Sequence, residues 1–332
     1  MLAHLGMRKV VCSVAKALAV TLVSVGALAA HAAPLKVGYS DWPGWVAWQV
    51  AIDKGWFKEA GVDVKFEWFD YSASMEAFAA GKLDVVAMTN GDALVTGSGG
   101  AKSVMFLITD YSSGNDQIVA KPGIKSLQDL KGKKVAVEAG LVDHLLLVNA
   151  LKKAGLKEAD ITLVNAKTNE LPQVFTAKDI AAIGVWQPVA GEALKAVPGS
   201  KAIYTSADEP GLIYDVMAAK PAVAKSRRAD LLKMVQVWDK VVAYIKDPST
   251  RTDAIKIMAA RSGVSPADYE TFVNGTRLLS VAEGKSIYAK GIGFKSIYGS
   301  TDFVNKFNVA NTVYKQAEKV ESYLDPSFYE GK

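Results

Sequence analysis

Hydrophobic and polar residues alternate along most of the chain with the periods of strands and helices. Short apolar runs predict strands at 35–39, 62–69, 84–88, 104–108, 134–137, 161–164, 180–185 and 202–205. Helical spacing between them predicts helices at 46–58, 74–80, 92–97, 143–154, 171–177 and 189–196. This repeated β-α order predicts an α/β fold in which mostly parallel sheets are flanked by helices.

The pattern restarts once and then changes character. It restarts after Lys121-Pro122-Gly123, and an extended return segment follows at 211–218. From about residue 226 the chain is mostly helical, with a long amphipathic helix predicted at 228–246. We therefore predict two lobes, the first formed by 33–121 and 215–332 and the second by 122–214.

The first 32 residues have the features of an export signal. Arg8, Lys9 and Lys16 form a basic start, and an uncharged, mostly apolar run follows at 17–30. Ala30-His31-Ala32 supplies a small-x-small cleavage pattern, so we predict a signal peptide at 1–32 and a protein located in the periplasm. A buried N-terminal helix is the alternative, and Met7 is an alternative start.

Composition and charge exclude several classes of function. The 332 residues are 50% hydrophobic and 22% charged, which is typical of a globular protein. The net charge is +5, but without residues 1–32 the chain has 36 basic and 34 acidic residues, so nothing indicates nucleic-acid binding. The only cysteine is Cys12, so residues 33–332 contain no disulfide, zinc-thiolate site or cysteine nucleophile. His144 is the only histidine after residue 32, which excludes the common zinc ligand sets; we expect no metal, no cofactor and no enzyme activity.

Candidate binding residues follow from the ends of the predicted strands. In open α/β sheets, ligands bind beyond the carboxyl ends of the strands, and two lobes joined by two crossings form a cleft there. The candidates are dominated by aromatic and acidic side chains and include no Lys or Arg: Asp41, Trp42, Trp45, Asn90, Asp92, Asp110, Glu138, Trp186, Tyr214 and Asp215.

Some of these residues also fit a purely structural role. Asp41 and Asp92 are equally well placed to cap the helices that follow them. Three other tryptophans, Trp48, Trp68 and Trp238, are expected in the core, and His144 is expected to pack against or cap its helix rather than contact a ligand.

The chain resembles a known family, the periplasmic substrate-binding proteins of the nitrate, sulfonate and taurine class of ABC importers. The resemblance runs from Leu35 to about Ala260. It is carried by the segments 35–39, 53–64, 80–84, 126–135, 144–156 and Val185-Trp186-Gln187-Pro188. It implies a two-lobed periplasmic-binding-protein fold (type II), ligand capture in the cleft, delivery to a membrane permease with its ATPase, and a monomer. Pyrimidine-precursor synthases of thiamine biosynthesis share this fold, but they depend on Cys and His residues that are missing here.

The chain departs from that family at the second-lobe loop. Sulfonate binders usually have Gly-Ser or Gly-Thr there, whereas this chain has Glu138-Ala139-Gly140-Leu141. A carboxylate opposes an anion and favours a cation or a planar N–H donor such as guanidinium. The stretch 39–45 also resembles the branch linked to urea- and guanidine-type compounds. We expect a small nitrogen-rich ligand, cationic or urea-like, with guanidine or a simple derivative favoured; a sulfonate, taurine, nitrate or a pyrimidine is the alternative.

Overall fold

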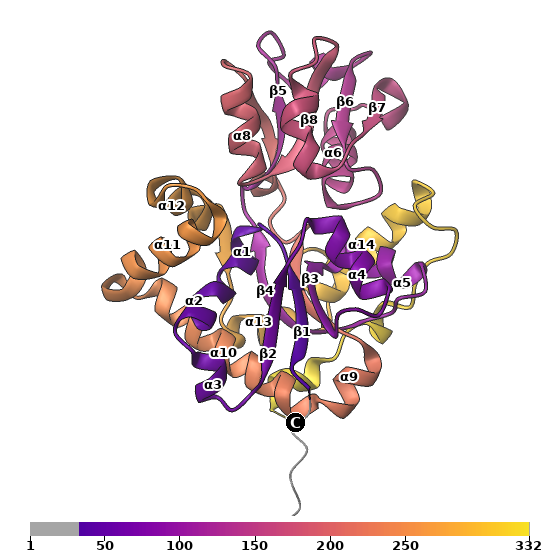
Figure 1. Cartoon of the computed structure of the whole chain (residues 1–332). Coiled ribbons are helices and arrows are strands. Elements are labelled where there is room, and N and C mark those ends of the chain that lie inside the picture. The colour runs from indigo at the N-terminus through magenta and orange to yellow at the C-terminus, as the bar shows by residue number, and fades with distance from the viewer. Residues whose placement is uncertain (1–32, 332) are drawn as a thin grey trace, which may run out of the picture. The chain divides into compact units, whose positions relative to one another are not determined.

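Two β-sheets organise residues 33–331, which are the part of the chain that this computed structural model describes (Figure 1). The predicted signal peptide at 1–32 lies outside the described residues. The first sheet has six strands in the order β11-β4-β10-β3-β1-β2. The second has five in the order β7-β6-β8-β5-β9. We call the elements around the first sheet the first lobe and those around the second sheet the second lobe.

The strands lie close to their predicted positions, except that those at 116–120 and 276–278 were not predicted. Those of the first sheet are β1 (Leu35–Tyr39), β2 (Val64–Trp68), β3 (Val85–Thr89), β4 (Val104–Ser112), β10 (Tyr214–Ala219) and β11 (Thr276–Leu278). Those of the second are β5 (Asp116–Ala120), β6 (Lys134–Val137), β7 (Thr162–Asn165), β8 (Ile180–Trp186) and β9 (Lys201–Thr205). Strand β5 lies in the second sheet, which favours a first crossing slightly before residue 121; the lobe boundaries themselves stay a prediction.

Both sheets are mixed, but four of the six strands in the first sheet and four of the five in the second run in one direction, which agrees with the predicted mostly parallel sheets. Strand β1 pairs in parallel with β2 and β3, and β6 pairs in parallel with β7 and β8. Strands β10 and β5, by contrast, are antiparallel to both of their neighbours. Each of these two strands enters its sheet from the other lobe. Such a strand begins at the edge where the parallel strands end, and it therefore runs against them.

The helices cover both faces of each sheet. In the first lobe they are α1 (Pro43–Val46), α2 (Trp48–Asp53), α3 (Trp56–Glu59), α4 (Tyr71–Ala79), α5 (Asn90–Ser98), α9 (Pro221–Ser226), α10 (Arg228–Lys246), α11 (Pro248–Ser262), α12 (Pro266–Asn274), α13 (Val281–Ile287) and α14 (Ile297–Ala310). In the second lobe they are α6 (Val142–Lys153), α7 (Leu171–Phe175) and α8 (Val189–Ala196). The single helix predicted at 46–58 is divided, because Gly55 takes a positive φ of 71° between α2 and α3.

Alternation along the strands divides the core of the second lobe. Ile183 and Val185 of β8 face a cluster formed with α7 and α8. Ala182, the neighbour of Ile183 along the strand, faces the larger cluster that includes α6. Because successive side chains point to opposite faces of a sheet, a continuous apolar strand such as β8 is needed to bury both faces.

The helical part after residue 226 packs against the first lobe. Helix α10 has the predicted bounds, and its Trp238 packs on Trp48 of α2 with ring centroids 4.8 Å apart. Both tryptophans are fully buried, which confirms their assignment to the core. The prediction for Trp68 was wrong. It is 37% exposed at the edge strand β2, and the Arg261 guanidinium lies 4.2 Å from its ring centroid.

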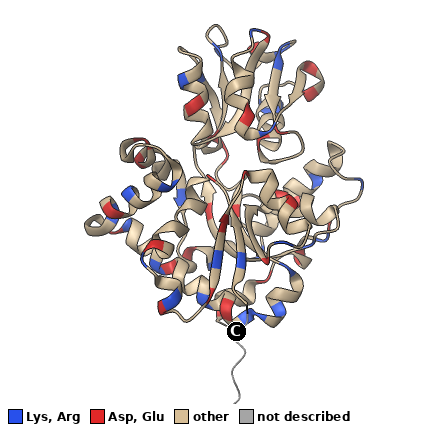
Figure 2. Cartoon of the chain, in the orientation of Figure 1, with Lys and Arg blue, Asp and Glu red and all other residues tan. Residues whose placement is uncertain are grey.

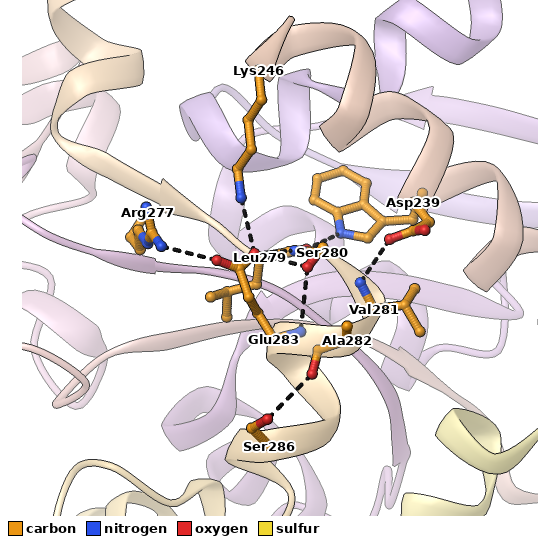
Figure 3. A network of polar contacts seen from close by, with 10 residues as sticks. Asp239, Lys246, Arg277, Leu279, Ser280, Val281, Ala282, Glu283 and Ser286 are labelled. Carbon is orange, nitrogen blue, oxygen red and sulfur yellow. Dashed lines mark hydrogen bonds and ion pairs between the residues drawn. The ribbon is translucent and has the colours of Figure 1, made fainter.

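A polar network fixes α13 to its neighbours (Figure 3). Ser280 and Glu283 form a capping box at the start of the helix, and Glu283 also accepts hydrogen bonds from Lys246 and Arg277. Partial burial alone would raise the pKa of Glu283, but the bonds from Lys246 and Ser280 outweigh it and lower the pKa to about 2. This part of the first lobe is therefore held by charge-assisted bonds at neutral pH.

Basic and acidic residues are interspersed over the helices of both lobes (Figure 2). Within residues 33–331, no helix combines the length and apolar character needed to cross a bilayer. The same residues contain no group of three or more His, Cys, Asp or Glu side chains placed to hold a metal ion.

Candidate functional site

A small cavity lies where the two lobes meet. It has room for about one water molecule and is lined by Trp42, Trp45, Tyr71, Thr89, Asp116, Val142, Trp186, Ile213 and Asp215. Asp116, Val142 and Trp186 belong to the second lobe, and Trp42, Trp45, Tyr71, Thr89 and Asp215 belong to the first. A second hollow of similar size shares Thr89, Val142 and Ile213 with it. Residues from both lobes are therefore needed to complete the site.

Aromatic rings form much of the cavity wall. Trp45 stacks on Tyr71 with ring centroids 5.2 Å apart and an interplanar angle of 24°. Trp186, from the other lobe, meets the same Tyr71 ring edge-on at 5.2 Å. The Tyr71 hydroxyl is fixed because it donates to Asp92 Oδ2 at 2.6 Å and accepts from the backbone N–H of Thr89 at 3.1 Å. These walls can stack on a flat or cationic guest.

Asp110 and Asp215 form a carboxyl pair in the first lobe. They are register partners on β4 and β10, and both are buried. The Trp42 indole N–H donates to Asp110 Oδ1 at 2.9 Å, and in the described part of the chain Oδ2 of each aspartate has no partner except the carboxyl group of the other aspartate. Burial raises the pKa of Asp110 to about 6, and burial together with the Asp110 charge raises that of Asp215 well above its usual range. The pair therefore tends to hold a proton between its two groups.

The second lobe contributes two more buried carboxyl groups. Asp116 begins β5, and its Oδ2 has no partner among the described residues. Burial raises the pKa of Asp116 to about 7; a hydrogen bond with Ser112 opposes this, and the charges of Asp110 and Asp92 add to it. Asp143 lies in the first turn of α6, with neither carboxyl oxygen partnered, and burial followed by the Asp116 charge raises its pKa strongly.

Predicted candidates Trp42, Trp45, Trp186 and Asp215 line the cavity, and Asn90 and Asp92 line the adjoining hollow. Asp110 lies behind Trp42, to which it is hydrogen bonded. Burial raises the pKa of Asp92 to about 7, although bonds from Tyr71 and Thr89 oppose the rise. The cap of α5 is Thr89, whose hydroxyl accepts from the Asp92 N–H, so neither Asp92 nor Asp41 is the residue that caps its helix.

The remaining candidates have other partners. Glu138 Oε2 accepts from the N–H and the hydroxyl of Thr168 at 3.1 and 2.9 Å, and Glu138 does not line either hollow. Asp41 accepts from the Trp186 indole at 3.4 Å, and the Tyr214 hydroxyl donates to the backbone oxygen of Phe294 at 2.7 Å.

Two further residues act as structural ties. Asn90 donates to Ser300 and Thr301 and accepts from the Tyr214 N–H, which ties α5, β10 and α14 together. His144 packs as expected: its Nδ1 accepts from Gly140, so Nε2 carries the hydrogen that bonds Glu158 at 2.9 Å.

Tyr71, Asp116 and Asp143 were not among the site residues predicted from the sequence. A search of residues that follow strands finds only the carboxyl ends, whereas β5 starts at the cavity because it is antiparallel to β8. Tyr71 does follow a strand, β2, after a two-residue link, so the same rule could have found it. Asp143 was treated only as the start of a helix.

The combination of sheet topology and sequence identifies the family. Residues 42–250 match the family described as NMT1/THI5 like, which is more than half of the chain. This chain belongs to the NMT1/THI5-like family. The predicted family resemblance is thereby confirmed, and the two-lobed fold expected from it agrees with the two sheets described above.

Members of the NMT1/THI5-like family with known names resemble this chain along much of its length. A protein of Brucella abortus (strain 2308), whose name gives it a binding role without a ligand, is 33% identical over 322 residues, covering 95% of each chain. The taurine-binding periplasmic protein of Escherichia coli (strain K12) is 26% identical, covering 69% of this chain and 73% of its own.

A solved structure has the same fold. The alkanesulfonate-binding protein SsuA from Xanthomonas axonopodis pv. citri, bound to MOPS, aligns with a TM-score of 0.72 and 17% identity, covering 90% of this chain and 99% of its own.

Proposed function

We propose that this protein is the extracytoplasmic solute-binding component of an ABC importer for a small nitrogen-rich cation, with guanidinium or a simple derivative favoured. One observation carries the ligand class. The cavity places carboxyl oxygens of the buried Asp116 and Asp215, neither of which has a cationic partner, beside stacked aromatic rings, and among residues 33–331 no Lys, Arg or His lines it or the adjoining hollow.

An anion is disfavoured by elementary electrostatics. Wherever a carboxyl group of the wall is ionised, an anion about 4 Å away is repelled by roughly 4 kcal/mol at an effective dielectric constant near 20. Oxyanion sites are built from N–H donors and cations, whereas this wall offers carboxyl groups. A guanidinium ion fits better, because its N–H groups can donate to carboxylates while its flat face stacks on Trp45 or Trp186.

Closure of the two lobes is the mechanism we propose for capture. The Trp186 indole reaches Asp41 at 3.4 Å, and Asn169 of the second lobe donates to Asp70 at 3.1 Å. A ligand that contacts both lobes binds the closed form more strongly than the open form and so shifts the equilibrium. The permease and its ATPase would then receive the closed protein. The predicted export signal at 1–32 and the periplasmic name of a relative support this location.

Taurine or a sulfonate is the second candidate, because relatives carry those ligands in their names. The test is a thermal-shift and calorimetric panel of guanidinium chloride, methylguanidine, urea, taurine, an alkanesulfonate and nitrate. A ligand that binds only the folded state raises the melting temperature at saturating concentration. We expect guanidinium to give the largest shift and the anions none. A shift with taurine or nitrate and none with guanidinium would overturn the proposal.

A further inference from the structure

The carboxyl groups at the cavity are more numerous than one small cation requires. Five acidic side chains lie at or behind its wall, all of them buried: Asp92, Asp110, Asp116, Asp143 and Asp215. Apart from the contact between the carboxyl groups of Asp110 and Asp215, the oxygens without a partner in the described part of the chain are Asp110 Oδ2, Asp116 Oδ2, Asp215 Oδ2 and both oxygens of Asp143. We call the five side chains together the acid set.

Every element packed around the acid set presents a neutral or an acidic group. From the first lobe these are the Tyr71 hydroxyl on α4, Thr89 at the end of β3, Ser112 on β4, the Trp42 indole and Tyr269 on α12. From the second lobe they are Glu138 after β6 and the set's own Asp143. Within residues 33–331, the hydrogen-bond partners of the set include no Lys, Arg or His.

Such a set cannot be fully ionised without a counter-charge. Burial disfavours each carboxylate, and each charge disfavours the next. The pKa values accordingly rise to about 6 for Asp110 and about 7 for Asp92 and Asp116, and the pKa values of Asp215 and Asp143 are raised well above the usual range of an aspartate. Near neutral pH the set therefore retains protons while no cation is bound.

The cavity also limits how much positive charge can enter. Trp45, Tyr71 and Trp186 close it in and leave little free space, which favours a compact monocation over a long polyamine. One entering charge compensates one carboxylate, so a proton becomes unfavourable at the position that the cation occupies. The described residues contain no group of three or more His, Cys, Asp or Glu side chains placed to hold a metal ion that could supply this charge instead.

We propose that ligand binding at this site is an exchange, in which a monocation seated between Asp116 and Asp215 replaces one proton held by the acid set. The O–H bond of one carboxylic acid breaks, its electron pair stays on the carboxylate, and the proton passes to the solvent buffer. The net charge of the site is then the same before and after binding. This inference rests on the proposed function and adds to it the coupling between capture and pH.

Calorimetry of the full protein with guanidinium chloride tests the exchange. Titrations near pH 6.5 in two buffers of different ionisation enthalpy give the number of protons released per cation bound. Near pH 6.5 we expect up to about one proton to be released per cation bound, and this number should decline toward zero at about pH 8.5. As the pH rises toward about 7, the affinity should increase by up to about tenfold per pH unit. Binding with no proton release anywhere between about pH 5.5 and 8.5 overturns the exchange but leaves the proposed function intact. No binding of guanidinium at any pH overturns both.

Variants assign the proton to the acid set. Asp116→Asn and Asp215→Asn resemble the protonated side chain, so both should fold, and each should weaken binding by at least about tenfold and reduce the proton release. The matched control is Asp302→Asn, whose exposed carboxylate pairs with Lys306 on α14; it should retain wild-type affinity and proton release. Undiminished proton release in both Asp116→Asn and Asp215→Asn would also overturn the exchange.

Discussion

The indole Nε1 of Trp186 donates a hydrogen bond to Oδ1 of Asp41 at 3.4 Å, and this bond joins the second lobe to the first at the rim of the cavity. Burial raises the pKa of Asp41 to about 6, while the bond from Trp186 opposes the rise. In the proposed closure Asp41 acts through Trp186, and it does not line the cavity itself.

Removal of this indole N–H should weaken ligand capture. Trp186→Phe retains an aromatic ring but loses the donor, and a hydrogen bond to a charged group contributes about 1.5–3 kcal/mol. We expect a loss of roughly fivefold to tenfold in guanidinium affinity by calorimetry, because the bond is long. Trp68→Phe, on an edge strand outside the cavity lining, is the control and should bind as the wild type does. Equal affinities for both variants would contradict a closure role for this bond.

The ligand-free protein should become less stable as the pH rises from about 4 to about 7. Asp92 and Asp116 have folded-state pKa values of about 7 against 3.8 for an unperturbed aspartate, so the native state binds more protons than the unfolded state in this window. Stability therefore falls with rising pH, and it is fully present only below the unfolded value.

Urea unfolding at about pH 5 and 7.5 measures this difference. We expect a loss of a few kcal/mol at the higher pH, a smaller loss in Asp116→Asn, and recovery with saturating guanidinium. Glu283, whose pKa is lowered to about 2, acts in the opposite sense and loses its contribution only as the pH falls below about 4. Stability that rises steadily from pH 5 to 7.5 without ligand would contradict the burial of protonated carboxyl groups.

The buried Tyr71 hydroxyl should contribute to the stability of the folded protein. Tyr71→Phe keeps the ring stacked on Trp45 but leaves Asp92 Oδ2 without its donor and the Thr89 N–H without its acceptor. Leaving buried polar groups unsatisfied costs about 1–3 kcal/mol. Urea unfolding should show this loss, whereas Tyr244→Phe, which removes an exposed bond to Asp253, should change the stability by less than about 0.5 kcal/mol. A similar effect of the two substitutions would argue against the buried network.

Glu138 and Asp116 should differ in their effect on the ligand. Glu138→Gln keeps an oxygen that can accept the two bonds from Thr168, and Glu138 does not line the cavity, so we expect a change in affinity of less than about threefold. Asp116→Asn removes a charge at the cavity wall and should weaken binding by at least about tenfold. If Glu138→Gln caused the larger loss in calorimetry, the sequence-based assignment of Glu138 to the ligand would be preferred.

Much of the second lobe and of the helical tail could be predicted because their signals are local. The bounds of β6, α8 and α10 agree with the apolar periodicity and its stop signals. Edge strand β2 shows where periodicity fails. Trp68 alternates as a core residue does, yet cation–π contact with Arg261, distant in sequence, lets it remain partly exposed.

The aromatic and acidic character of the site was predicted from the sequence, but not all of its residues were. Strand ends led to Trp42, Trp45, Trp186 and Asp215, because the carboxyl edge of a sheet is a property of chain direction. The same reasoning overlooked Asp116, since its strand enters from the opposite lobe and begins at the cavity.

The sequence by itself determined that the chain alternates strands and helices, that residues 33–332 have no thiol and one histidine, and that acidic and aromatic residues follow the strands. These are properties of local pattern and of residue supply. Only the tertiary structure decided which carboxyl groups are buried together and without a cation, because burial and the distance between charges depend on segments as far apart as Asp110 and Asp215. A pKa is set by that assembled surrounding, so no local pattern could reveal it.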